Sequence, residues 1–108
     1  MPTTITGSDT PAAGTSTVDA GDVGVADLNA YQITFQVTAL GANTIAISGK
    51  GPGGEYDATP VAAALANDGV VVVGKEDDAY YTEYQFVASA GTAHVIHWTA
   101  IRKNEYLR

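Results

Sequence analysis

The chain has 108 residues, a formal net charge of −7, a sequence pI near 4.3 and no cysteine. This length fits one small domain, and the acidic balance argues against nucleic acid as a partner, because its phosphates would repel such a surface. The lack of cysteine excludes disulfides and thiolate chemistry and disfavours a structural zinc site.

The N-terminal stretch to about Ser16 is rich in Thr, Ser, Gly, Ala and Pro, with little large hydrophobic material beyond Ile5. Such a composition does not offset its own ordering entropy. We therefore expect residues 1–16 to form a flexible or extended arm and residues 17–108 to form a β-sandwich domain. The stretch lacks the basic and apolar regions of a signal peptide, and no run approaches the roughly 20 apolar residues of a membrane span.

The clearest strand pattern lies in residues 31–40, YQITFQVTAL. Apolar and polar residues alternate there with a period of two and many are β-branched, which is typical of a half-buried strand. The alternation recurs in TIAIS, residues 44–48. The apolar positions are Ile33, Phe35, Val37 and Ala39 in the first segment and Ile45 and Ile47 in the second.

The three residues between these segments, Gly41–Asn43, favour a hairpin. Such a loop would pair Val37 with Ile47, so that both apolar rows share one face. Gly49 would then lie opposite Phe35, where its missing side chain leaves room for the ring.

The stretch GKGPGGEYD, residues 49–57, matches G-x-G-x-x-G. A dinucleotide fingerprint needs a helix after the glycines, but EYDATP follows, and Pro52 removes an amide donor. A P-loop also fails, because Gly51 follows Lys50 where Ser or Thr is required. We interpret the stretch as a connection between strands, with Tyr56 returning the chain toward the sheet.

Residues 58–69, ATPVAAALANDG, are interpreted as a connection whose Ala-rich centre permits one helical turn. VVVVGK predicts a short buried strand, and EDDA predicts a charged loop. A second hairpin is expected around Ser89–Gly91, with Gly91 left-handed. Its buried face would carry Tyr84, Phe86, Ile96 and Trp98.

Weaker alternation around Val18, Val23 and Val25 allows one or two earlier strands. No helical period is sustained anywhere in the chain. We therefore predict an all-β fold: a single β-sandwich, jelly-roll or Ig-like, of about seven or eight antiparallel strands with an extended N-terminal arm.

The two histidines do not form a metal site, because residues three apart in a strand point to opposite faces. We interpret His94 as a rim residue and His97 as a sheet-surface residue, with Glu83 a candidate neighbour. A small hydrolase using Glu83 and His97 is an alternative. The chain has no nucleophile elbow, so we expect no enzyme.

Carboxylate clusters raise a calcium hypothesis, because calcium takes oxygen ligands from loops. The candidates are Glu76–Asp78 and the group of Asp19, Asp22 and Asp27. Neither has the EF-hand pattern, so we expect solvated acidic loops and neither metal nor cofactor.

Aromatic and basic residues supply the candidate interface. Tyrosine can stack on a sugar or anchor a protein contact, and three of the five basic residues fall in the last seven positions. Tyr84 and Trp98 are assigned to the core. The candidate interface residues are Tyr80, Tyr81, Arg102, Lys103, Tyr106 and Arg108.

The layout of the chain resembles that of the small β-sandwich virion proteins of tailed bacteriophages. The segments that carry the resemblance are, in order, TIAISGKGPGGEYDAT, NDGVVVVG, and YQFVAS with AGT and AHVIHWTAIR. In those proteins a strand, a Gly-Ser-Asp-Gly-like loop and a Trp or Tyr precede a Gly-x-Val-Val-x-Gly strand and a closing hairpin. The resemblance covers about Leu28 to Arg102. Tyr56 matches the aromatic residue, whereas the Asp of the turn is absent here.

The resemblance implies a capsid decoration (cement) protein or a related accessory protein, assembled in the host cytoplasm onto the virion surface. Such a protein catalyses no reaction. Its implied partners are the major capsid protein or other virion proteins, with a homo-oligomer left open and no nucleic acid, membrane or cofactor. The alternative is a carbohydrate- or receptor-binding module of a phage tail or fibre, in which Tyr56, Tyr80 or Tyr81 stacks on a sugar.

Overall fold

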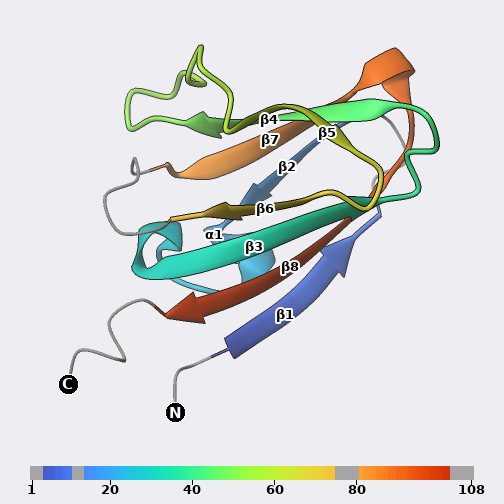
Figure 1. Cartoon of the computed structure of the whole chain (residues 1–108). Coiled ribbons are helices and arrows are strands. Elements are labelled where there is room, and N and C mark those ends of the chain that lie inside the picture. The colour runs from blue at the N-terminus through green and yellow to red at the C-terminus, as the bar shows by residue number, and fades with distance from the viewer. Residues whose placement is uncertain (1–3, 11–13, 75–80, 103–108) are drawn as a thin grey trace.

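The computed structural model describes residues 4–10, 14–74 and 81–102. Eight antiparallel strands form two four-stranded sheets that pack face to face (Figure 1), which confirms the predicted all-β sandwich. The first sheet has the order β1 (Thr4–Asp9), β8 (Val95–Arg102), β3 (Tyr31–Thr38) and β6 (Val70–Val73). The second has the order β2 (Thr15–Asp19), β7 (Glu83–Ala88), β4 (Thr44–Lys50) and β5 (Ala62–Ala66).

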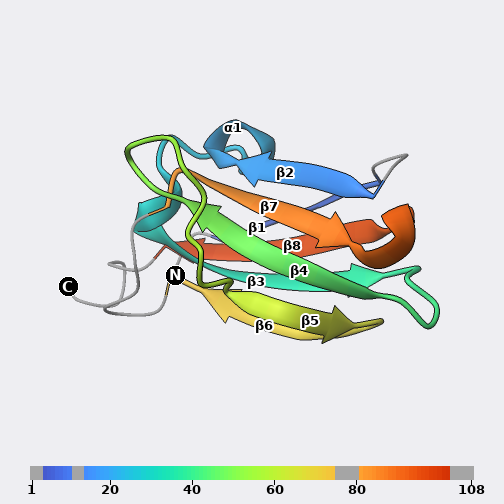
Figure 2. The ribbon, with the colours of Figure 1, turned by 90° about the horizontal axis from the view of Figure 1, so that it is seen from above.

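The strand orders β1-β8-β3-β6 and β2-β7-β4-β5 are those of a jelly roll, which is built from two Greek keys. Except for β4 and β5, strands that follow one another in the chain lie in different sheets. Figure 2 shows β5 and β6 along the same side of the sandwich, although they belong to different sheets. Three short helices complete the fold: α1 (Ala20–Val23), η1 (Leu28–Ala30) and η2 (Ser89–Gly91). Among the described residues, no helix is long and apolar enough to span a membrane.

The hairpin predicted between β3 and β4 is wrong. Val37 lies opposite Ile96 of β8, and Ile47 lies opposite Phe86 of β7. The chain crosses the sandwich at Leu40, which is buried and donates its backbone N–H to Asn67 Oδ1 at 3.0 Å. A hairpin and a crossing bury the same apolar rows, so alternation alone does not distinguish them.

The second predicted hairpin is also wrong in its pairing, because β7 and β8 lie in opposite sheets. Its predicted face is confirmed, since Tyr84, Phe86, Ile96 and Trp98 are all buried. Gly91 has a φ of 63°, the left-handed conformation predicted for it. The turn at η2 therefore reverses the chain, and the following residues carry it to the other sheet.

Two further predictions between residues 58 and 74 need correction. The Ala-rich segment Ala62–Ala66 is strand β5 and not a helical turn, because it hydrogen-bonds along β4. Strand β6 is an edge strand and not a buried one, since only Val73 is buried and Val70 is 53% exposed.

The N-terminal range 1–16 contains strand β1 and the first two residues of β2. Strand β1 pairs with β8 from Thr4 to Asp9. Small residues suit this position, because a Cβ at Gly7 would stand 2.7 Å from the Trp98 ring. Of the weaker alternation, Val18 lies buried in β2, whereas Val23 ends helix α1.

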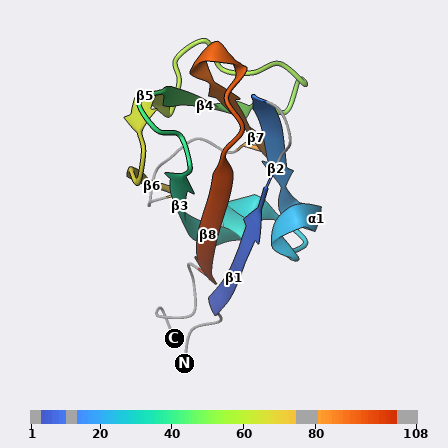
Figure 3. The ribbon, with the colours of Figure 1, turned by 90° about the vertical axis from the view of Figure 1, so that its right-hand side faces the viewer.

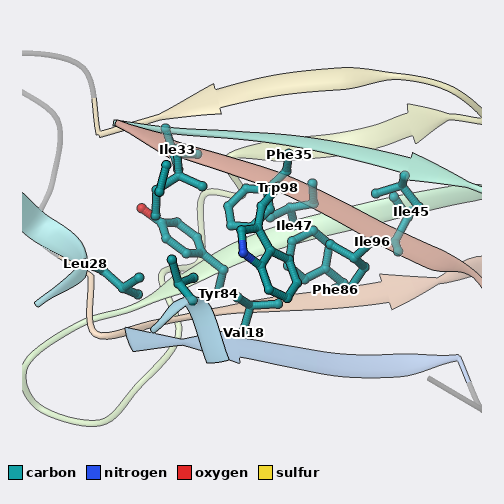
Figure 4. Close-up of a cluster of buried hydrophobic side chains, with 14 of the residues drawn as sticks. Val18, Leu28, Ile33, Phe35, Ile45, Ile47, Tyr84, Phe86, Ile96 and Trp98 are labelled. Carbon is teal, nitrogen blue, oxygen red and sulfur yellow. The ribbon is translucent and has the colours of Figure 1, made fainter. Parts of the chain in front are cut away.

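The core lies between the sheets, and its centre is a group of aromatic rings (Figure 4). The Phe35 ring meets Phe86 edge to face at 5.1 Å between ring centroids, and it meets Tyr84 at 5.5 Å. Trp98 packs in the same cluster, as the sequence predicted. Edge-to-face contacts add to the burial of apolar surface, so these rings fix how the sheets stack.

Candidate functional site

The outer face of the first sheet carries no charged side chain among the residues that the structure describes. We call it the neutral face. In its central row Thr6, Thr99, Thr34 and Val72 stand side by side across all four strands. The other members are Thr4, Ser8, Gln32, Gln36, Thr38, Val70, Val95, His97 and Ile101. The whole chain has 12 acidic and five basic residues, so an uncharged face differs from the acidic composition of the chain as a whole.

Hydrogen bonds hold two long side chains of the neutral face in place. His97 Nε2 lies 3.1 Å from Thr38 Oγ1, and Gln36 Nε2 donates to the Asp68 carbonyl at 3.1 Å. The sheet-surface position predicted for His97 is therefore confirmed, but Glu83 is not its neighbour. Glu83 lies on the outer face of the opposite sheet, so the described structure does not assemble the hydrolase pair.

The outer face of the second sheet does carry charge at one end. Asp19, Glu83 and Lys50 follow one another across three strands, with Lys50 Nζ 4.0 Å from Glu83 Oε2. Tyr56 donates its hydroxyl to the same carboxylate oxygen. Burial first and the neighbouring Glu83 second raise the pKa of Tyr56 to about 12.

The glycine-rich stretch is the connection that the sequence predicted. It leaves β4, turns through Gly54 at a φ of 89°, and returns at Tyr56, which forms a β-bridge with Lys50. Gly49 was predicted to leave room for the ring of Phe35. The ring that occupies the space beside Gly49 is instead that of Tyr81.

Tyr81 and Asp57 border a pocket of about 210 Å³ at the end of β6. The Tyr81 hydroxyl donates to Asp57 Oδ2 at 2.8 Å, and the Thr59 amide donates to Asp57 Oδ1 at 2.9 Å. The Thr59 amide first and the Tyr81 hydroxyl second lower the pKa of Asp57. The other lining residues are Pro60, Val61, Val73, Gly74 and Tyr84.

Two of the six candidate interface residues are described. Tyr81 is half-buried beside this pocket, and Arg102 is exposed at the end of β8, opposite Tyr31. Gly74 lines the pocket and packs against the Tyr31 carbonyl, so Tyr81 and Arg102 lie at the same end of the sandwich. The remaining candidates, Tyr80, Lys103, Tyr106 and Arg108, lie outside the described residues, as does Glu76–Asp78.

The other calcium candidates cap helices. Asp19 and Asp22 each accept a hydrogen bond from the other's backbone N–H and form a capping box at α1. Asp27 Oδ1 accepts from the Asn29 amide at 2.9 Å and caps η1. In the described part of the chain, no group of three potential metal-ligating side chains converges.

His94 is buried, which corrects the rim position predicted for it. Its Nδ1 lies 3.1 Å from the Thr92 carbonyl, and its Nε2 lies 3.1 Å from Ser16 Oγ. Because a carbonyl only accepts, Nδ1 donates to it, and a neutral ring then accepts from Ser16 at Nε2. The pair joins β2 to the connection between β7 and β8. No local sequence pattern predicted the contact between Ser16 and His94, because the two residues are 78 positions apart in the chain.

No protein-family model matches the chain, and no curated protein matches its sequence. Among solved structures, it is similar to the NLP core of Drosophila, whose crystal structure was described as giving insight into pentamer formation and histone binding. The sequence identity is 15% and the TM-score 0.46, and the match covers 94% of this chain and 99% of the other.

Proposed function

We propose that this protein is a non-enzymatic structural protein of a bacteriophage virion, a decoration protein that binds the lattice of major capsid protein. The proposal rests on the resemblance of residues 28–102 to such proteins. The observation that carries it in the structure is the neutral face. The centres of protein interfaces are depleted of charged residues relative to the rest of a protein surface.

The dimensions of the neutral face bear on how it would bind. Strands lie about 4.8 Å apart and rise about 3.3 Å per residue, so four strands of about six residues present roughly 400 Å². A standard interface buries about 800 Å² per partner. The neutral face would therefore supply about half of the contact. Among the described residues β6 pairs on one side only, with β3, so its other edge offers main-chain groups to which a strand of the partner can add.

The test is binding to empty shells assembled from the major capsid protein of a tailed bacteriophage. We expect saturable binding in many copies per shell. Thr99→Glu places a charge at the centre of the neutral face, between Thr6 and Thr34. It should weaken binding at least tenfold, because the carboxylate would be desolvated without a partner. Thr17→Glu is the matched control, since it adds the same charge on the exposed face of the other sheet.

Two results would contradict the proposal. The first is that the purified chain does not bind to shells under conditions in which it is folded. The second is equal weakening by Thr99→Glu and Thr17→Glu, because general acidity, and not the neutral face, would then govern the contact.

A carbohydrate- or receptor-binding module of a phage tail or fibre is the second proposal. The hydroxyls of Tyr56 and Tyr81, the described tyrosines expected to meet a sugar, are both bonded to carboxylates of the chain itself. The observation that favours this proposal is a different one, a pocket of about 340 Å³ between β1 and α1 whose lining includes Thr6, Ser8, Asp9 and Asp22. A glycan array tests it, and uniform failure to retain the chain would count against it.

A further inference from the structure

One side of the sandwich is built from two strands that carry only apolar side chains. Strands β5 and β6 each end their sheet, and Figure 3 shows them on one side of the sandwich, with β1 and β2 on the other. Their sequences are AAALA and VVVV, and we call this side the apolar edge. The strands of the opposite side, TITGSD and TSTVD, are rich in hydroxyl groups, and each ends in an aspartate.

The apolar edge lacks the features that keep an open strand from pairing with another chain. Native proteins protect edge strands with charged side chains, proline or bulges. None of these interrupts β6, whose register with β3 is unbroken from Val70 to Val73. Val70 is 53% exposed, more than any other large hydrophobic residue that the structure describes. Strand β6 is therefore a site to which another strand can add.

The main-chain groups of Val70 and Val72 point to the open side of β6. The Val37 amide donates to the Gly69 carbonyl at 3.2 Å, so these two residues form a hydrogen-bonded pair where β3 meets β6. Hydrogen-bonded and non-hydrogen-bonded pairs alternate along an antiparallel ladder. Val71 therefore bonds to β3, whereas the N–H and C=O groups of Val70 and Val72 face outward.

A second copy of β6 fits this edge about a two-fold axis. With the strands antiparallel and the axis at Val71, Val70 of each copy stands opposite Val72 of the other. These are the residues with outward main-chain groups, so each pair exchanges both of its hydrogen bonds. The contact is isologous, because the same surface serves on both sides, and this is the commonest kind in soluble oligomers.

Charge favours the apolar edge for contact between copies. Each copy has a net charge of −7, so two copies repel each other wherever their acidic groups meet. Strands β5 and β6 bring no charged side chain to the contact. Asp68 precedes β6 and would stand opposite Gly74 of the other copy. Six residues of about 3.3 Å then separate the two aspartates by roughly 20 Å, a distance at which salt screens their repulsion.

The neutral face ends at β6, so pairing at this strand joins the neutral faces of two copies. One face presents roughly 400 Å² and two present roughly 800 Å², the area that a standard interface buries per partner. A strand of another protein would widen the neutral face by one strand only. A second copy therefore supplies the half of the contact that one chain leaves unfilled.

We propose that the apolar edge binds a second copy of this chain through antiparallel pairing of β6 with β6. The contact spans about five residues of two sheets about 10 Å apart, so it buries less than about 1,200 Å² in total and is of the weak, reversible class. The dimer therefore forms as the chain is concentrated. The joining of the neutral faces rests on the proposed shell binding, whereas the contact between copies does not.

The chain has no cysteine, so variants with a single cysteine test the pairing directly. Val71→Cys places a thiol on the two-fold axis, where the Cα atoms of a non-hydrogen-bonded pair lie about 4.5 Å apart, within reach of a disulfide. Thr17→Cys is the matched control, because it places a thiol at an exposed position of the edge strand β2. Under the same oxidant, Val71→Cys should form at least tenfold more covalent dimer, although its thiol is less exposed.

Sedimentation equilibrium tests the contact without a cross-link. The mass of the unchanged chain should rise from 11.1 kDa toward twice that value as the concentration increases. Val70→Glu should weaken the association at least tenfold, because it brings a carboxylate from each copy to the paired edge. Val87→Glu replaces the other exposed valine, which lies on β7 inside the second sheet, and should leave the association unchanged. Circular dichroism establishes that each variant is folded.

Thr99→Glu separates this inference from the decoration proposal. It should lose shell binding but associate like the unchanged chain, because Thr99 lies on β8, away from the apolar edge. NMR locates the contact, since concentration-dependent amide shifts should occur in β5 and β6.

Several results would overturn the inference. It is wrong if the unchanged chain stays monomeric at every concentration, if both cysteine variants form equal amounts of dimer, or if Val70→Glu and Val87→Glu associate equally. Amide shifts confined to β1 or β2 would identify a different contact between copies. A monomeric chain whose β6 amides become protected only on shells would show that a strand of the capsid protein occupies the edge.

Discussion

Replacement of Gly7 by alanine is the sharpest test of how β1 is held. The added Cβ would stand 2.7 Å from three atoms of the Trp98 ring, whereas ordinary contacts begin near 3.4 Å, so the groups must separate by about 0.7 Å. Trp98 is fixed in the core, and its strand pairs with β1 on one side and β3 on the other. The strain therefore falls on the β1–β8 pairing.

Overpacking of this kind costs about 1–3 kcal/mol. A cost of about 2 kcal/mol would lower Tm by roughly 8 °C in a domain of this size. Gly53→Ala is the matched control, because a Cβ at Gly53 meets nothing within 4 Å and its backbone is not left-handed. It should change the free energy of unfolding by less than about 0.5 kcal/mol. Thermal unfolding followed by circular dichroism measures both.

Combining Gly7→Ala with Trp98→Leu isolates the contact, since leucine has no ring atoms at the positions of Nε1, Cε2 and Cζ2. In the double-mutant cycle, Gly7→Ala should cost less on the Trp98→Leu background than on the unchanged chain. Equal stability of Gly7→Ala and Gly53→Ala, or strictly additive effects in the cycle, would refute the packing of β1 over the indole.

Two further predictions concern titration and buried polar contacts. The pKa of Tyr56 is raised to about 12 from a reference value of 10.0, so its contribution to stability is fully present below pH 10 and is lost as pH rises toward 12. Ultraviolet titration should show one late-titrating tyrosine fewer in Tyr56→Phe than in the unchanged chain, and an unchanged number of late tyrosines would contradict the assignment. His94→Ala should lower the free energy of unfolding by about 2–4 kcal/mol, because it leaves a cavity and a partly buried Ser16 hydroxyl without its partner. His97→Ala, at an exposed position, should change it by less than about 0.5 kcal/mol in urea unfolding, and equal effects of the two would refute the buried pair.

The sequence alone determined which residues face the core. Period-two alternation places Ile33, Phe35 and Val37 on one side of their strand, and they are buried as predicted. Ala39, the last position of the predicted row, is exposed, because the strand ends at Thr38. It also determined that the glycine-rich stretch is a connection, because neither the helix nor the donors of a phosphate site follow it. These features depend on neighbours in the chain, which are visible in the order of residues.

Only the tertiary structure decided which strands pair. Alternation identifies the buried side of a strand but not whether the facing row belongs to its own sheet or to the opposite one. Both hairpins were predicted as local pairings, and both connections cross the sandwich. The edge position of β6 and the strand character of Ala62–Ala66 have the same origin, because each depends on a partner strand that is distant in the sequence.

The same reason explains what was and was not foreseen of the candidate sites. Each polar row of the neutral face is visible in its own strand, but the jelly-roll order is what joins Thr6, Thr99 and Thr34 into one uncharged surface. Trp98 was correctly assigned to the core. That its Nε1 has no hydrogen-bond partner among the described residues accompanies the packing of β1 over the ring, which is a contact between segments far apart in the chain.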